Sequence, residues 1–350
     1  MREARDFAGL SFPFAAGVAA SAFLPMHFPP FAAALLPAPV LLLLHPGFRR
    51  YFRAVAVAVF FLLGMLGFAL AELPGPVPEE SAFAGKALAS FDALMDGAGF
   101  RENTGALLRA LLTGRRDALP PEVTAAFRAA GASHILALSG LHLGIIYLIV
   151  SKLLGFLGRS RAAALLRSAT VVAGCTAFTL VTGACPSMIR ALIFIVFAEL
   201  SRHSPGRRRD PLLIWCAALM IQLVLNPAAV ESTGFQLSYL AMLGIGLLFP
   251  VLDRWYPPSR GPVRKIWSSM ALSISAQTFT APLVWLRFGT FPVYFLLTNL
   301  LAMPMTSVLM ACAIISLSLE AFGLNPALAV RATDTAAAAL TGTLEVIAGL

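Results

Sequence analysis

The sequence predicts an all-α, polytopic integral membrane protein. Of its 350 residues, 59% are hydrophobic and only 12% are charged, whereas soluble domains are about 45–50% apolar and about 25% charged. Mean hydropathy is +0.82, and the apolar residues come in runs near the length of about 20 that crosses a bilayer as a helix. These observations exclude a disordered chain, a disulfide-stapled secreted domain and an ordinary soluble enzyme.

The apolar runs predict nine to eleven transmembrane helices, because several candidate segments are short or contain proline. We expect some of these helices to be broken or re-entrant. The first segment follows Arg2 and Arg5 and resembles a signal peptide, but it lacks a small-residue cleavage site before a polar region, so we expect it to be retained as a helix. The candidate spans are 7–25, 31–45, 54–72, 134–155, 168–184, 187–200, 211–226, 235–252, 267–287, 292–318 and 328–350.

Lysine and arginine concentrate in alternate loops, which predicts the orientation of the chain. With the N-terminus in the cytoplasm, one side of the membrane receives most of the 26 basic residues. The net charge of +9 therefore reflects mainly topology and is weak evidence for nucleic-acid binding. The cytoplasmic set is Arg2, Arg5, Arg49, Arg50, Arg53, Lys152, Arg159, Arg161, Arg167, Arg202, Arg207, Arg208, Arg209, Arg254, Arg260, Arg264 and Lys265.

The same topology divides the chain into three regions. Residues 1–72 are N-terminal transmembrane helices, 73–133 form an extracytoplasmic segment, and 134–350 form a transmembrane core. The middle region contains an amphipathic helix over 101–114, and Pro120 and Pro121 start another helix. The amphipathic helix either lies in the membrane interface or at a pore mouth, or packs on its own bundle. Its apolar face consists of Leu107, Leu108, Leu111 and Leu112.

Motifs for enzyme chemistry are not found. No G-x-x-x-x-G-K-[ST] sequence is present, so no P-loop ATPase is encoded. The five histidines form no recognised metal-binding pattern, and the four cysteines form no C-x-x-C pair. Ser139 is not in a nucleophile elbow. We therefore predict no catalytic residue, no metal site and no cofactor.

Polar residues inside the predicted spans are the functional candidates, because such groups usually face the bundle interior or line a path. Ser139 and His142 open the fourth span, together with Gly140 and Gly144, whose spacing allows close helix packing or leaves room for a ligand. Arg190 follows a turn near the predicted outer surface, where it either snorkels to the interface or lines a pore.

The second half of the chain contributes further polar groups. Gln236 and Ser238 begin one span, Gln277 lies in the middle of the next, and Asn299 is near the middle of the one after. Pro304 follows Asn299 and removes a backbone hydrogen bond, so we expect a helix break there. Broken helices at membrane depth are typical of translocation paths.

Four blocks, in order, carry a resemblance to a known family. They read LLTGRRDALPPEVTAAFRAAGASHILALSGLHLGII, LVTGACPSMIRALIF, NPAAVESTGFQLSYLAMLGIGLL and AQTFTAPLVWLRFGTFPVYFLLTNLLAMP. This order and spacing resemble the competence domain of ComEC-type proteins, the inner-membrane channel that carries single-stranded DNA into the cytoplasm in natural transformation. The resemblance covers residues 100–320 approximately, and the S-G-L-H block is its most specific part.

The resemblance implies a channel in the bacterial cytoplasmic membrane rather than an enzyme. It implies single-stranded DNA and the lipid bilayer as partners, with a cytoplasmic helicase-like ATPase and an extracytoplasmic DNA receptor; the sequence leaves a homo-oligomer open. The outer arginines have an alternative interpretation as a solvated or lipid-facing surface. Candidate residues of the DNA path or its mouth are Arg109, Arg115, Arg116, Arg128, Ser139, His142, Arg190, Gln236, Ser238, Gln277 and Asn299.

Two domains common in that family are not expected here. The stretch 73–101 is too short for the family's OB-like barrel, and we find no metallo-β-lactamase-like segment, so nuclease activity is not transferred. A small-molecule or lipid-linked transporter, or a truncated remnant without function, stays open as an alternative. An intramembrane enzyme ranks lowest because we find no pair of Asp or Glu residues embedded in the spans; Glu199, Asp334 and Glu345 lie near span ends or in the last helix.

Overall fold

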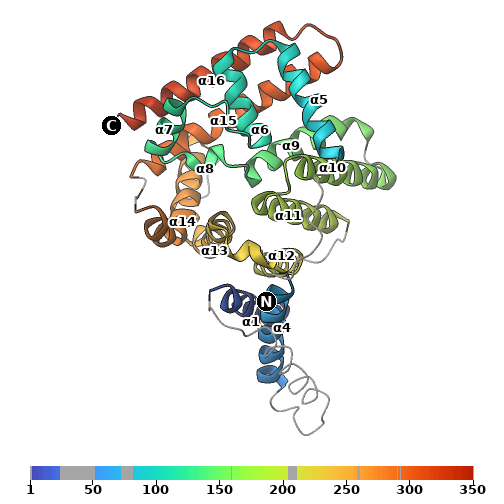
Figure 1. The fold of residues 1–350 in the computed structure, drawn as a ribbon, viewed down its shortest axis with the longest axis vertical. Coiled ribbons are helices and arrows are strands. Elements are labelled where there is room, and N and C mark those ends of the chain that lie inside the picture. Colours follow the sequence, from blue (N-terminus) through green and yellow to red (C-terminus); the bar gives the residue numbers. More distant parts are fainter. Residues whose placement is uncertain are drawn as a thin grey trace. The chain divides into compact units, whose positions relative to one another are not determined.

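The chain is almost entirely helical wherever its structure is described. The structure is a computed structural model, and it describes residues 2–23, 52–71, 82–158, 160–203, 211–257, 261–289, 291 and 293–349. These residues form fourteen α-helices and two short 3-10 helices, and they contain no strand (Figure 1). The predicted all-α class is confirmed.

Ten of the eleven predicted spans correspond to helices, and the remaining one, 31–45, lies outside the described residues. The helices α10, α13 and α15 are long and apolar enough to cross a membrane, and shorter apolar helices cover Phe7–Phe23, Arg53–Ala69, Gly140–Phe156 and Pro211–Leu225. The protein is a polytopic membrane protein. The matching helices are α1 (Arg2–Phe23), α4 (Phe52–Ala71), α8 (Ser133–Leu136) with α9 (Gly140–Leu153), α10 (Arg161–Val181), α11 (Pro186–Arg202), α12 (Pro211–Leu225), α13 (Thr233–Asp253), α14 (Pro262–Phe288), α15 (Phe295–Ala321) and α16 (Ala327–Ala348).

The chain divides into two compact units, the first made of residues 1–77 and 200–247 and the second of residues 78–199 and 248–350. In the first unit α1 and α4 pack closely through glycines. A Cβ atom at Gly17 would overlap the carbonyl oxygen of Phe61, and one at Gly64 would overlap that of Phe14. The boundaries of these units differ from those of the predicted regions 1–72, 73–133 and 134–350. Those regions were defined by membrane topology, and they stay a prediction.

The second unit contains three helices from the predicted extracytoplasmic segment: α5 (Ala82–Ala98), α6 (Glu102–Thr113) and α7 (Pro121–Ala129). The four leucines that form the apolar face of α6 are each at most 4% exposed. They share one hydrophobic core with residues of α15 and α16. Of the two alternatives for this helix, the structure therefore supports packing on its own bundle. The sequence did not predict α5.

Helix interruptions occur at other places than prolines. The predicted span 134–155 is interrupted between α8 and α9, where Ala137 is extended. A turn at 182–185 separates α10 from α11, and it places Gly183 and Ala184 at positive φ. Pro304, by contrast, lies inside the continuous helix α15. The break expected at Pro304 was wrong, because losing one hydrogen bond does not end a helix of this length that is packed in a bundle.

Candidate functional site

The S-G-L-H sequence forms the N-terminus of α9. Ser139 is the N-cap residue, with extended backbone angles, and its N–H donates to Nδ1 of His142 over 3.0 Å. The Ser139 Oγ atom lies 3.1 Å from the same nitrogen. A side chain three residues into the helix thus bonds back to the N-cap backbone, as Glu or Gln does in a capping box. This geometry explains the fixed spacing of serine and histidine.

His142 keeps one donor without a partner. A ring nitrogen that accepts a hydrogen bond carries no proton, so the imidazole is neutral and its proton lies on Nε2. The His142 side chain is 0% exposed, and its Nε2 atom has no hydrogen-bond partner in the described part of the chain. Buried donors are nearly always paired in native proteins. This N–H is therefore available to an acceptor from outside the described residues.

The first turn of α11 lies against this end of α9. Ser187 Oγ donates to the carbonyl of Leu138 over 2.6 Å, and a Cβ at Gly140 would lie 3.3 Å from Cβ of Ala191. Arg190 belongs to the same turn and is 7% exposed. The N-termini of two helices, each with partial positive charge, therefore meet beside a buried arginine, and such a junction favours an anion.

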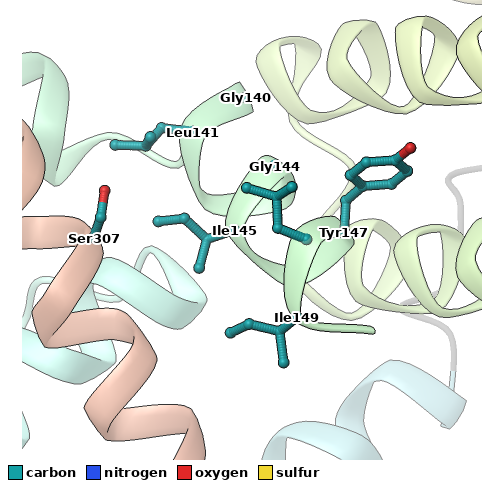
Figure 2. A pocket seen from close by; sticks show the side chains of 8 residues that line it. Gly140, Leu141, Gly144, Ile145, Tyr147, Ile149 and Ser307 are labelled. Atoms are coloured by element: carbon teal, nitrogen blue, oxygen red, sulfur yellow. The ribbon is translucent and has the colours of Figure 1, made fainter. Parts of the chain in front are cut away.

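The two glycines of α9 have different surroundings. Gly140 meets Ala191, which fits close packing, whereas no heavy atom lies within 4 Å of a Cβ built at Gly144. Gly144 instead lines a largely apolar cavity of about 600 Å³ beside α9. In Figure 2, Leu141 and Ile145 extend from α9 toward the side on which Ser307 of α15 lies. The sequence left both helix packing and space for a ligand open for these glycines. The structure is consistent with packing at Gly140 and with space at Gly144.

Glu199 ties three helices together, and sequence reasoning treated it only as an acid near a helix end. It is 3% exposed. Its Oε1 accepts from the Tyr147 hydroxyl of α9 over 2.6 Å, and its Oε2 accepts from Ser168 of α10 over 2.5 Å. The three residues are far apart in sequence, so no local pattern points to this cluster.

The predicted outer arginines are engaged with other parts of the second unit. Arg109 lies 2.6 Å from Asp96 and 3.4 Å from Asp92, and Arg115 lies 2.6 Å from Asp92. These ion pairs join α5 to α6 and to the residues that follow it. Arg116 donates to the Leu136 carbonyl over 3.0 Å. Their contact with DNA stays a prediction, and the ion pairs give them a structural role as well.

Arg128 differs from the other three. It lies near the end of α7 and is exposed. No hydrogen bond or ion pair joins its guanidinium group to another residue in the described part of the chain. It is therefore the outer arginine with the most freedom to meet a ligand.

Gln236 and Ser238 belong to the first compact unit. Gln236 Nε2 donates to the Val230 carbonyl over 2.7 Å, which fixes the short 3-10 helix Pro227–Glu231 before α13. Ser238 is half-buried. The hydrogen bond gives Gln236 a local structural role, and a role of either residue in a path stays a prediction.

Gln277 and Asn299 form a polar seam between α14 and α15. Asn299 Nδ2 lies 3.4 Å from Ser273 Oγ, and Ser273 and Gln277 are one turn apart on α14. Gln277 Nε2 and Asn299 Oδ1 are both buried, and neither has a hydrogen-bond partner among the described residues. The next residue, Thr298, donates to the Ala130 carbonyl over 2.6 Å and anchors α15 to the end of α7.

Metal-binding side chains do not gather in the described ranges. No group of three or more His, Cys, Asp or Glu residues within them is arranged to hold a metal ion. The arrangement of the second unit is that of a membrane helix bundle with a few buried, unsatisfied polar atoms.

Comparison with known proteins identifies the family. The family model described as "Competence protein" matches residues 111–350. The chain is 27% identical over 203 residues to ComE operon protein 3 of Bacillus subtilis (strain 168), covering 58% of this chain and 25% of that protein. It is 29% identical over 205 residues to competence protein ComA of Neisseria gonorrhoeae, covering 57% of this chain and 28% of that protein.

The chain therefore matches only about a quarter of the length of these relatives. No solved structure matches it significantly. The family model nevertheless covers well over half of the chain and includes the α9 terminus, Arg190 and the α14–α15 seam. On this evidence, the chain belongs to the competence protein family.

Proposed function

We propose that this chain is the membrane channel core through which single-stranded DNA enters the cytoplasm during natural transformation. The observation that carries the proposal is the family match over residues 111–350, because both relatives bear competence names. The match contains His142, Gln277 and Asn299, whose buried polar atoms have no partner among the described residues.

The electrostatics of the α9–α11 junction suit a polyanion. Arg190 and the two helix N-termini attract phosphate, and the His142 N–H donates to an acceptor oxygen. Lysines at the other ends of the spans of the same unit, such as Lys152 and Lys265, then meet the strand as it leaves. The strand passes from the predicted outer side, near Arg128, to the predicted cytoplasmic loops.

The proposal places the chain in the bacterial cytoplasmic membrane with its N-terminus in the cytoplasm. It acts as a channel rather than as an enzyme. Because the sequence contains no P-loop motif, a cytoplasmic helicase-like ATPase supplies the work, and an extracytoplasmic receptor delivers the DNA. The basic loops of the orientation argument support this direction.

Gene deletion followed by uptake of labelled DNA tests the function. Complementation with the wild-type chain restores uptake, and Arg190→Gln lowers it about tenfold, as expected for the loss of one buried charged contact. Arg331→Gln is the matched control, because Arg331 is exposed on α16 and outside the candidate set. Membrane levels of each variant are compared by immunoblot. Normal transformation in the deletion strain contradicts the proposal.

A second candidate function is a transporter of small molecules or lipid-linked substrates. The cavity beside α9 favours it, because its lining includes Leu141, Ile145, Leu148 and Ile149, and such a surface suits an apolar chain. Substrate-dependent flux in liposomes that is unaffected by added single-stranded DNA supports this alternative.

A further inference from the structure

The α14–α15 seam offers both halves of a hydrogen-bonding pair. Gln277 Nε2 is a buried donor and Asn299 Oδ1 is a buried acceptor, and neither has a hydrogen-bond partner among the described residues. The other polar atom of the Asn299 side chain, Nδ2, donates a hydrogen bond to Ser273 Oγ over 3.4 Å. With Nδ2 directed at Ser273 Oγ, the Asn299 amide leaves Oδ1 as its free atom, and that atom is an acceptor.

The two helices that contribute Gln277 and Asn299 carry no charged residue close to either of them. In α14 the charged residues are Arg264, Lys265 and Arg287, all near the helix ends, and α15 carries only Glu320, in its last turn. Nothing along these helices near Gln277 and Asn299 neutralises a phosphate. The seam differs in this respect from the α9–α11 junction, where Arg190 is buried.

The free acceptor at Asn299 selects among the parts of a DNA strand. Phosphate oxygens and the ether oxygens of the deoxyribose chain only accept hydrogen bonds, so they cannot satisfy another acceptor. The bases are the parts of single-stranded DNA that carry N–H donors, and each of the four bases presents both a donor and an acceptor. A base edge therefore offers the kind of partner that each of the two atoms lacks, and this chemistry does not require a particular sequence.

We propose that Gln277 and Asn299 form a base-contacting site of the channel, distinct from the phosphate-attracting junction of α9 and α11. This inference rests on the proposed function. Both atoms are shielded in the closed bundle, so a base reaches them only when α14 and α15 separate. A base that pairs with both amides offsets the cost of that separation, and a strand without bases does not.

The test compares two labelled strands of equal length and charge, one of deoxyadenosine and one in which every nucleotide is an abasic tetrahydrofuran. The full chain is reconstituted in liposomes with an inside-positive potential, which drives an anion inward. The measured quantity is the nuclease-protected label. We expect Gln277→Leu and Asn299→Leu each to slow the adenosine strand about three- to tenfold, the range for one lost hydrogen bond, and to leave the abasic strand unchanged.

The abasic strand also reports on folding, because an unfolded variant loses both activities. Thr278→Val is the matched control: Thr278 is exposed, adjoins Gln277, and its hydroxyl bonds to the Ile274 carbonyl of its own helix. If the amide variants slow both strands equally, or leave the ratio of adenosine-strand to abasic-strand import as in the wild type, the base-contacting site is overturned. The proposed channel function is not affected by that outcome. A wild-type chain that imports neither strand overturns the channel itself, and the base-contacting site with it.

Discussion

Replacing Tyr147 by phenylalanine tests whether the Glu199 cluster holds α9, α10 and α11 together. The change keeps the ring and removes the hydroxyl that donates to Glu199 Oε1 over 2.6 Å. Hydrogen bonds to charged groups contribute about 1.5–3 kcal/mol, so we expect the free energy of unfolding to fall by about that amount.

The assay is reversible unfolding of the purified chain in detergent, followed by a double-mutant cycle with Ser168→Ala. Because both hydroxyls bond to one carboxylate, we expect the two losses to be non-additive by at least about 0.5 kcal/mol. Tyr294→Phe is the control, since Tyr294 is exposed and surface changes usually stay within about 0.5 kcal/mol. A loss in Tyr147→Phe no larger than in this control refutes the reasoning.

Three further substitutions separate structural from functional roles. Gly64→Ala destabilises the first unit by more than about 2 kcal/mol, because the added Cβ overlaps a backbone carbonyl oxygen. Gly67→Ala on the same helix has no heavy atom within 4 Å of the added Cβ and raises the free energy of unfolding by up to about 1 kcal/mol. Thermal unfolding compares the two variants. Arg109→Met lowers stability by about 1 kcal/mol, and high salt reduces the difference, while Arg128→Met changes stability little and lowers DNA uptake instead. Ser139→Ala removes the Oγ atom that lies 3.1 Å from His142 Nδ1 and costs about 1 kcal/mol, and circular-dichroism melting should show this loss.

Local signals made the membrane helices predictable. The apolar runs placed α11 through α16 within five residues of their observed bounds, because a bilayer-spanning helix needs a long apolar run of its own, whereas α10 begins seven residues before the predicted start at 168. The helix α5 was not predicted because its sequence mixes Lys86, Asp92 and Asp96 with short apolar stretches. Its stability depends on contacts with residues outside this segment. Two of those acids pair with Arg109 of α6, a contact that no window over α5 alone reveals.

Contacts between distant residues limited what the sequence could say about the site. The histidine of S-G-L-H stood out as a polar group in an apolar helix, but its bond to the Ser139 backbone required the fold. Tyr147, Ser168 and Glu199 lie on three helices and become one cluster only when these pack. In the same way, Arg109 and Arg115, which the sequence offered as candidates for the mouth of a DNA path, have aspartate partners supplied by α5.

The buried polar groups of the second unit fall into two physical classes, and the division bears on function. Glu199, Ser187 and Thr298 are paired across helices, so their burial is offset within the chain and their role is to hold the bundle together. His142, Gln277 and Asn299 keep buried atoms that nothing in the described residues satisfies. An unsatisfied buried polar atom costs about 1–3 kcal/mol of folding free energy. An apolar side chain at the same position would not carry this cost. If the proposed function holds, a DNA strand that brings the missing donors and acceptors provides the compensation, so these three candidate residues are where contact with DNA should be tested.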